Sequence, residues 1–352
     1  MPKSDHWINS ISEPVSPENF VLWRPHLLDQ KTISASDLVK HFYSSGSVVT
    51  GITLGTFDGL HLGHRALVDR LNTELKNMKN QNSENIDIRR VMVSLYPHPR
   101  SVLNRSSVSS KLLTPLRIRR ELIRELPVDS CLMIRFTKAF SCLSAREFVE
   151  SILVKPFSPK LVVVGFDWCF GRDREGGIDL LKSLGNEFGF KTVVVGPVKD
   201  ISSSELKIGA TSIRQQLEQG LIKDANVLLG YPFSIMGRVV HGDGRGRLIG
   251  IPTANIHTNR QLLPGSGVYK TRALVGGNWY SSVTNVGFRP TFKTALEQRT
   301  ASVEVHILDF SDNIYSEIVR LEFLDWLRPE MKFDSVDRLV DQIRSDINSV
   351  RG

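Results

Sequence analysis

Residues 48–64 read VVTGITLGTFDGLHLGH, and this stretch decides the class of the fold. Its first seven residues carry no charge and are rich in β-branched residues, which is typical of a buried strand. A glycine-containing turn follows, and over residues 65–79 apolar residues recur on one side of a predicted helix. A buried strand that turns directly into a helix indicates an α/β sheet, in which ligands bind at the carboxyl ends of the strands.

The same alternation of strands and helices continues to residue 195. Each further strand is a short apolar run, and each helix shows apolar residues three and four apart. Strands that alternate with helices predict a parallel sheet covered on both faces, which is a Rossmann-like α/β domain. The strands are predicted at residues 91–95, 161–165 and 192–195, and the helices at residues 116–126, 145–153 and 178–188.

The pattern changes after Gly230, where strand-like segments follow one another with only Gly, Pro and Asn turns between them. Successive short strands that end in one helix predict an antiparallel β-barrel. The strands are predicted at residues 234–240, 267–275, 279–286, 301–308 and 318–323, and the helix at residues 336–347. We therefore expect an N-terminal extension over residues 1–46, an α/β domain over 47–229 and a barrel domain over 230–352.

The composition of the 352 residues is that of an ordinary globular protein with an excess of positive charge. It has 45 Lys and Arg against 37 Asp and Glu, a net charge of +8 that favours anionic ligands. The basic residues are scattered, so we expect no nucleic-acid partner. No apolar run is long enough to cross a membrane, and no secretory signal is visible. Together with only three cysteines, this predicts a cytoplasmic protein without a membrane partner.

The turn after the first strand is the first candidate site. Gly55 and Gly59 let the backbone approach a ligand closely, and Phe57 and Asp58 lie between them. His61 and His64 are three residues apart at the start of the helix, where rings and free N–H groups can bind phosphate. The competing interpretations are a solvated turn with two surface histidines, a zinc pair, and a simple turn role for Asp58.

Three further loops supply candidate ligands of the α/β domain. Pro97 and His98 follow the second strand and form a rigid loop. The loop after the 161–165 strand brings together a carboxylate, an aromatic ring and a guanidinium, which suit a planar heterocycle and phosphate; these are Asp167, Phe170 and Arg174. The alternative is a core phenylalanine with surface arginines.

Thr211 and Arg214 open a predicted helix near the end of the α/β domain. Thr211 stands in the position of an N-cap, and Arg214 would face the same helix end, which together would bind an anion. An ordinary cap with a solvated arginine is the alternative.

The barrel domain holds the second candidate site, which begins with a glycine-rich basic loop. The loop could wrap phosphates with backbone N–H groups and a guanidinium, and its members are Gly242, Gly244, Arg245 and Gly246. Thr253 and Asn255 follow with two neutral oxygens two residues apart, which suit Mg²⁺ shared with phosphates. A glycine-rich hairpin without a ligand is the alternative.

Glu304 lies on a predicted strand and shares one face with His306. A carboxylate at the mouth of a barrel can take a proton from an attacking hydroxyl. The alternative is the solvated face of a half-exposed strand.

These motifs, taken in order, resemble the bacterial bifunctional riboflavin kinase/FMN adenylyltransferase family, also called FAD synthetase. The HLGH of residues 61–64 is similar to the nucleotidyltransferase signature, and the resemblance covers residues 47–350. It implies a Rossmann-like nucleotidyltransferase domain followed by a six-stranded riboflavin-kinase barrel. It also implies two Mg²⁺-dependent reactions with ATP: riboflavin is phosphorylated to FMN, and FMN is then adenylylated to FAD with release of pyrophosphate.

The resemblance also implies a role for each matching residue. His61 and His64 would bind the ATP phosphates and stabilise the transition state, with Gly55, Phe57 and Asp58 in the same turn. The flavin and adenine region would be lined by Pro97, His98, Asp167 and Phe170, with Arg174 beside it, and the triphosphate held by Thr211 and Arg214. In the barrel, Thr253 and Asn255 would ligate Mg²⁺ and ATP, and Glu304 would be the base. The motif of Tyr269 matches the family's Gly-Val-Tyr strand, that of Arg328 matches an element near the flavin, and both residues are expected to bind a ligand. We expect a monomer or a weak homo-oligomer.

One departure from the family pattern keeps two other interpretations open. Gly209-Ala210 stand where the family usually has two serines. This favours a kinase with a weakened adenylyltransferase half, whereas the presence of His61, His64 and Arg214 disfavours that interpretation. A flavin- or nucleotide-binding protein without turnover is the other interpretation, and the presence of Glu304 disfavours it.

Overall fold

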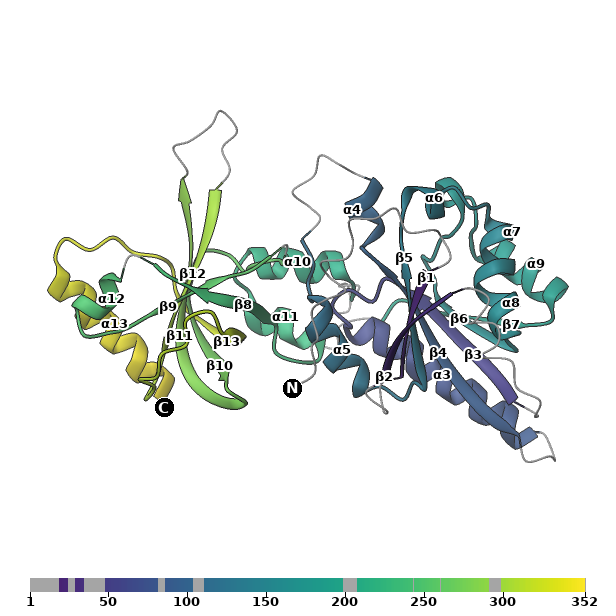
Figure 1. Ribbon diagram of the computed structural model, residues 1–352, viewed down its shortest axis with the longest axis horizontal. Helices are drawn as coiled ribbons and strands as arrows, with labels where there is room; N and C mark the ends of the chain where they lie inside the picture. The colour runs from purple at the N-terminus through teal and green to yellow at the C-terminus, as the bar shows by residue number, and fades with distance from the viewer. Residues whose placement is uncertain are drawn as a thin grey trace. The chain divides into compact units, whose positions relative to one another are not determined.

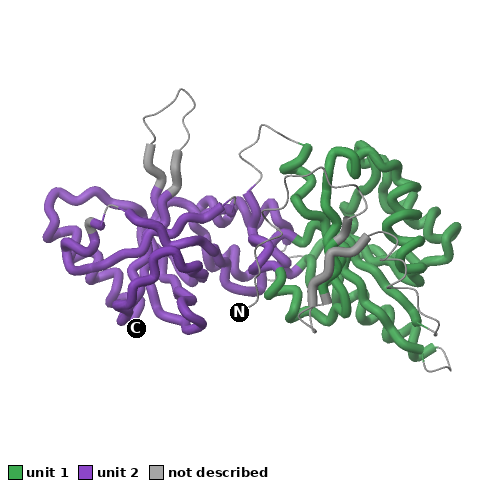
Figure 2. Tube along the Cα trace, viewed as in Figure 1, with its two compact units in different colours: residues 1–57, 63–110, 120–198 green, residues 58–62, 111–119, 199–352 purple. Residues whose placement is uncertain are grey.

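The computed structural model describes residues 19–24, 29–34, 48–81, 86–103, 111–198, 208–242, 244–259, 261–290 and 299–351. The chain divides into two compact units (Figure 2). Unit 1 comprises residues 1–57, 63–110 and 120–198, and unit 2 comprises residues 58–62, 111–119 and 199–352. Residues 199–229, which the sequence groups with the α/β domain, belong to unit 2, and a domain boundary at residue 229 stays a prediction.

Unit 1 is built on a seven-stranded sheet with the strand order β2-β1-β5-β4-β3-β6-β7 (Figure 1). The strands are β1 (Asn19–Arg24), β2 (Asp29–Ser34), β3 (Val48–Gly55), β4 (Asp87–Tyr96), β5 (Ser130–Arg135), β6 (Leu161–Gly165) and β7 (Lys191–Val195). β3 to β7 are mutually parallel, and β1 pairs antiparallel with both β2 and β5. The parallel α/β sheet predicted from the alternating pattern is confirmed.

Helices cover both faces of this sheet (Figure 1). The side chains of β3 alternate between the two faces, so the strand can be buried only if both faces are covered. Ile52 and Leu54 point to one face, where they join a hydrophobic core with residues of α7, η3 and α9. Gly51 points to the other face, where a Cβ would lie 2.8 Å from carbons of Leu71 and Leu75 on α3. The helices are α3 (Leu62–Gln81), α4 (Pro99–Leu103), α5 (Leu116–Arg124), α6 (Lys138–Ser141), α7 (Ala145–Phe148), the π-helix η3 (Val149–Val154), α8 (Lys155–Phe157), the 3-10 helix η4 (Arg172–Arg174) and α9 (Ile178–Phe188).

Several parts of unit 1 differ from the sequence-based prediction. The predicted extension over residues 1–46 contributes β1 and β2 to the sheet, and Trp23 of β1 is buried beneath the guanidinium of Arg120, 5.3 Å from its ring. The predicted helix over 145–153 widens into η3, which turns Val149, Ile152 and Leu153 together into the core. β5 was also not predicted, although its short apolar run, CLMI, is of the same kind as those of the predicted strands.

Unit 2 contains the barrel, which closes in the order β10-β11-β12-β9-β8-β13 with every pair antiparallel. The strands are β8 (Ser234–Val240), β9 (Ala254–His257), β10 (Gly267–Val275), β11 (Asn278–Pro290), β12 (Arg299–Ile307) and β13 (Ile318–Arg328). The unit also holds α10 (Ala210–Glu218), α11 (Ile222–Leu229), α12 (Arg245–Leu248) and α13 (Val336–Arg351). The six-stranded antiparallel barrel is therefore confirmed, with β9 as the strand that the pattern did not predict.

Gly51→Ala tests the close packing of α3 on β3. The added methyl would meet Leu71 and Leu75 at 2.8 Å, so we expect overpacking to lower the free energy of unfolding by about 1–3 kcal/mol. Gly196→Ala is the matched control, because nothing lies within 4 Å of a Cβ there. Urea unfolding followed by circular dichroism measures both, and equal midpoints for the two variants would contradict this packing.

Candidate functional site

The turn after β3 has a backbone that glycine and left-handed residues make possible. Phe57, Gly59 and Leu60 adopt φ values of 48°, 86° and 37°. The Phe57 ring is fully buried and lies 5.1 Å from the His64 ring, centroid to centroid. Phe57 was expected to bind a ligand, and its burial instead makes it a packing partner of His64.

Asp58 is buried, and its carboxylate accepts hydrogen bonds from several groups of unit 2. The backbone N–H groups of Leu113 and Thr114 donate at 3.1 Å, and Arg119 Nη2 donates at 3.2 Å. Arg214 Nη2 donates to the second carboxylate oxygen. Asp58 is therefore not a solvated turn residue. The sequence analysis predicted that it binds a ligand directly, but both of its carboxylate oxygens accept from donors of the protein.

The two histidines of the turn lie where the sequence predicted them, around the first turn of α3. His61 directly precedes α3 and is 6% exposed, and His64 is a half-buried residue of the first turn. Because β3 is parallel to its neighbours, the turn follows the carboxyl end of a central strand. This is the edge at which ligands of parallel sheets bind.

The loop after β4 lies at the same edge of the parallel sheet. Pro97 and His98 are both half-buried, and the Tyr96–Pro97 peptide bond is cis. The backbone N–H of Arg100 donates to His98 Nδ1 at 3.2 Å, which orients the imidazole at the start of α4.

The loop after β6 places its aromatic residues differently from the prediction. Phe170 is 5% exposed and belongs to the hydrophobic core, so the core alternative holds for this ring. Trp168 stacks on Phe170 with centroids 4.6 Å apart and stays half-buried, which makes it the more accessible ring. Asp167 is exposed. Arg174 is exposed, and its hydrogen bond to the Cys169 Sγ raises the pKa of the guanidinium.

The start of α10 corrects the predicted N-cap. The cap residue is Gly209, and the Ser212 hydroxyl bonds the backbone of Gly209, accepting from its N–H at 3.3 Å. Thr211 is instead an exposed residue within the first turn, because the helix begins two residues earlier than a Thr211 cap would require. Arg214 lies one turn further along and also donates to the carbonyl of Ala210 at 3.2 Å.

The barrel site is organised by the pairing register of three strands. Glu304 of β12 lies directly opposite Asn255 of β9 on one side and Asn285 of β11 on the other. All three residues are half-buried, between apolar neighbours that face the barrel interior. The strand pairing therefore brings Glu304 beside Asn255, as the predicted site requires.

The glycine-rich loop packs against the residues that precede β9. A Cβ at Gly242 would collide with the Asn255 amide, and one at Gly246 would lie 3.0 Å from Thr253 Oγ1. Gly244 adopts a φ of 69° and precedes α12, whose first residue is Arg245. The Arg245 side chain lies outside what the structure describes. His306 Nδ1 is 2.8 Å from the Pro252 carbonyl oxygen, which ties this loop to β12.

Two residues expected at the flavin side of the barrel site are used for packing. Tyr269 is fully buried, donates to the carbonyl of Gly265 and packs edge-to-face on Phe323, and burial raises the pKa of its hydroxyl. Arg328 makes a two-pronged ion pair with Asp346 of α13, with Nη2 to Oδ2 at 2.8 Å. Both residues therefore hold the barrel together, because their polar groups already have partners inside the protein.

The sequence analysis assigned no role to Arg119, Asn285 or Glu330. Arg119 is 1% exposed, and it stands between Ile118 and Leu122 in the buried stripe of α5. A charged residue at an apolar position of a helix was the available signal. Asn285 Nδ2 donates to Glu330 Oε1 at 3.3 Å, a contact over 45 positions that no local pattern encodes.

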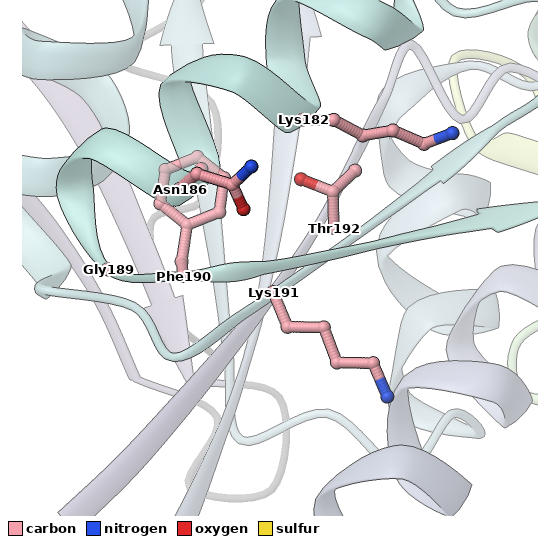
Figure 3. Close-up of a pocket in the computed structure, with 7 residues that line it drawn as sticks. Lys182, Asn186, Gly189, Phe190, Lys191 and Thr192 are labelled. Carbon is pink, nitrogen blue, oxygen red and sulfur yellow. The ribbon is translucent and has the colours of Figure 1, made fainter.

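Unit 1 also has an open cavity of about 550 Å³, shown in Figure 3. Its lining includes Lys182 and Asn186 of α9 and Lys191 and Thr192 of β7. Lys191 begins β7 and donates to Glu74 at 2.9 Å, so the cavity lies at the amino end of the strand. The candidate site residues follow the carboxyl ends of the parallel strands, at the opposite edge of the sheet. Over the described ranges, no three His, Cys, Asp or Glu side chains gather as a metal site.

Comparisons with known proteins match both parts of the chain. The family model for FAD synthetase matches residues 45–208, and the model for riboflavin kinase matches residues 229–352. The bifunctional riboflavin kinase/FMN adenylyltransferase of Listeria monocytogenes is 37% identical over 85% of this chain and 91% of its own. That of Escherichia coli K12 is 37% identical over 84% and 90%, and that of Bacillus subtilis 31% over 87% and 93%.

A solved structure shares the arrangement of the chain. It is a Streptococcus pneumoniae protein described as a macrolide-efflux protein, which is 32% identical, has a TM-score of 0.77 and covers 89% of this chain and 96% of its own. In the portion of our chain that the structure describes, no helix has the length and apolar character needed to cross a membrane.

Asp346→Ala tests whether Arg328 has a structural partner. Removal of the carboxylate leaves a guanidinium that is only 15% exposed without its counterion, so we expect a loss of about 3–5 kcal/mol in the free energy of unfolding. Asp341→Ala on the same helix is the control, because its pair with Arg344 is 3.9 Å long and exposed, and should cost less than about 1 kcal/mol. Thermal unfolding measures the stability of both variants. If Asp346→Ala leaves the stability unchanged, the ion pair of Arg328 has no structural role.

Proposed function

The chain belongs to the family of bifunctional riboflavin kinase/FMN adenylyltransferases, and on that premise we propose how its residues share the two reactions. Its C-terminal region phosphorylates riboflavin with ATP to give FMN. Its N-terminal region transfers AMP from ATP to FMN, which gives FAD and pyrophosphate. The observation that carries this conclusion is the order of the two family matches, FAD synthetase over residues 45–208 and riboflavin kinase over residues 229–352.

Glu304 is the general base of the kinase reaction. It takes the proton of the riboflavin 5′-hydroxyl as that oxygen attacks the terminal phosphorus of ATP. The register that sets Glu304 opposite Asn255 supports this role, because it brings a carboxylate beside the residues expected to hold the phosphates. The backbone of the glycine-rich loop, with Gly242, Gly244 and Gly246, would surround the phosphates, and Arg245 would add a charge.

Thr253 and Asn255 are the residues that would hold Mg²⁺ together with ATP. Their hydroxyl and amide oxygens are hard neutral ligands, which suit a magnesium ion that keeps water and phosphate in its shell. The donor set fits, because Gly242 and Gly246 approach these two side chains more closely than any larger residue could. When bound, the ion would neutralise charge on the phosphates during transfer.

Adenylyl transfer relies on electrostatic stabilisation by His61, His64 and Arg214. FMN phosphate attacks the α-phosphorus of ATP, and negative charge grows on the oxygens around phosphorus and on the leaving pyrophosphate. Imidazoles at the amino end of α3 donate to these oxygens, and the helix N–H groups add to the field. The contact between Phe57 and His64 supports a fixed orientation of that ring.

The remaining loops of the parallel sheet would bind the planar parts of the substrates. Pro97 and His98 follow β4, and Asp167 with the accessible Trp168 follows β6. An indole stacks on a heterocycle, and a carboxylate accepts from its ring N–H or amino groups. We further propose domains over 47–229 and 230–352, a cytoplasmic location, and a monomer or weak homo-oligomer.

His61→Ala should reduce FAD formation and spare FMN formation. Loss of one donor to a developing charge costs about 10²–10³-fold in turnover. The test is chromatography of products from two tubes with ATP and Mg²⁺, one given riboflavin and one given FMN. Wild-type protein should make FMN and then FAD from riboflavin. If the wild-type protein gives no product in either tube, a binding protein without turnover is favoured. If it makes FMN without FAD, a kinase with a weakened adenylyltransferase half is favoured.

Glu304→Gln should have the reverse effect. Removal of the base should lower FMN formation by about 10²–10⁴-fold, whereas FAD formation from supplied FMN should be unchanged. Glu317→Gln, at an exposed position outside the site, is the control and should alter neither rate. Full FMN formation by Glu304→Gln would exclude this carboxylate as the base.

A further inference from the structure

Two arginines of α5 lie over a single tryptophan ring in unit 1. The guanidinium carbon of Arg120 is 5.3 Å from the centroid of the Trp23 ring, and that of Arg124 is 6.0 Å from it. The indole is only 2% exposed, whereas Arg120 is half-buried and Arg124 is exposed. The two arginines are four positions apart, which sets them on one face of the helix. Solvent can therefore reach both guanidiniums, and the indole lies beneath them.

Neither arginine has an anionic partner within the part of the chain that the structure describes. Elsewhere in unit 1, Arg90 pairs with the Asp129 carboxylate at 3.1 Å. Arg120 and Arg124 form no such ion pair among the described residues. The indole Nε1 of Trp23 is a buried donor that also has no acceptor there. The three side chains thus bring donors together without an acceptor.

The two positive charges of the pair also disfavour each other. Burial and the charge of Arg124 lower the pKa of the Arg120 guanidinium. The π face of the Trp23 ring attracts both cations, but the ring is neutral and leaves their charges uncompensated. An opposite charge within a few ångströms favours the charged form of such groups. The electrostatics of the pair therefore favour an anionic ligand.

The chemistry of the pair suits a phosphate group better than a single carboxylate. Each guanidinium presents a planar fork of N–H donors, which binds two oxygens of an oxyanion at once. A carboxylate has two oxygens and one negative charge, so one fork is enough to satisfy it. A phosphate has more oxygens and carries a charge of about −1.5 to −2 at neutral pH. It can therefore bind both forks and compensate both charges.

The arginine pair lies away from the loops proposed for adenylyl transfer. Trp23 pairs with Cys131, the second residue of β5, so the ring lies toward the amino end of that strand. The loops that carry the proposed site residues follow the carboxyl ends of the parallel strands. Trp23 also precedes residue 45, where the match to the FAD synthetase model begins. A ligand on the pair would therefore be separate from the substrates at that edge.

We propose that Arg120 and Arg124, held over the Trp23 ring, form a binding site for a phosphate group that takes part in neither reaction. The phosphate is free or is the monoester of a small molecule, and both sources present the same oxygens to the two guanidiniums. The site combines a strand of the N-terminal extension with a helix of the α/β sheet.

Chemical protection of the wild-type chain tests the site residue by residue. Phenylglyoxal modifies arginine side chains, and mass spectrometry of the peptides measures the rate at each one. Inorganic phosphate at ten times its dissociation constant should slow the modification of Arg120 and Arg124 about tenfold. Arg344, which is exposed on α13, is the internal control and should react at an unchanged rate. Glycerol 3-phosphate replaces inorganic phosphate in a second series, and the stronger protector identifies the source. Protection by neither compound would overturn the proposal.

Arg124→Gln tests whether the two guanidiniums bind one ligand. Loss of a charged donor should raise the phosphate concentration that half-protects Arg120 by about tenfold or more. Lys76→Gln removes the same charge from an exposed position of α3 and should leave that concentration unchanged. Both variants should form FMN and FAD at wild-type rates, which reports that they are folded. Unchanged protection of Arg120 in Arg124→Gln, or an equal loss in Lys76→Gln, would overturn the shared site.

Discussion

The buried carboxylate of Asp58 fixes three segments that are far apart in sequence. It accepts from the backbone N–H groups of Leu113 and Thr114, which precede α5, and from the guanidinium of Arg214 on α10. A carboxylate that is 1% exposed is stable only when donors satisfy it, so each of these segments must return to the same place on folding. Gly59 reinforces the arrangement, because its N–H donates to Thr114 Oγ1 at 3.0 Å and its φ of 86° suits glycine. The hydrogen bonds of this cluster therefore set the position of the turn that carries His61.

The barrel site depends on a different constraint, which is strand register. Glu304, Asn255 and Asn285 lie side by side only because β9, β12 and β11 pair as they do. A shift of one residue would turn Glu304 into the apolar interior, where Val303 and Val305 now lie, and barrel closure resists such a shift. The two candidate sites therefore differ in physical character: one turn is fixed by a buried ionic cluster, and the other site is a row of polar side chains on a closed barrel.

The sequence predicted the elements whose apolar pattern is regular and the motifs that follow them. β3, β6, β8, β10 and α9 were found with nearly their observed bounds, because burial on one or both faces leaves a clear period. The directions and the hydrogen-bond partners of polar side chains were harder to predict from the sequence. Phe170, Tyr269 and Arg328 have side chains that suit a ligand site and the protein interior equally well. Only their partners in the fold, such as Asp346 for Arg328, distinguish the two possibilities. Thr211 shows the same limit at short range, since the helix begins two residues earlier than predicted and Gly209 becomes the cap.

The pair of strands contributed by the N-terminal extension changes what the sheet presents at its border. The match to FAD synthetase begins at residue 45, so β1 and β2 lie before the segment shared with that family model. Without them, β5 would be a border strand with a row of unpaired backbone N–H and C=O groups, which is a template for association of two copies. β1 pairs with four residues of β5, and the border passes to β2, whose sequence includes Asp29 and Lys31. Charged border strands discourage sheet-to-sheet addition. The extension thus covers the backbone groups that β5 would otherwise expose at the border of the sheet.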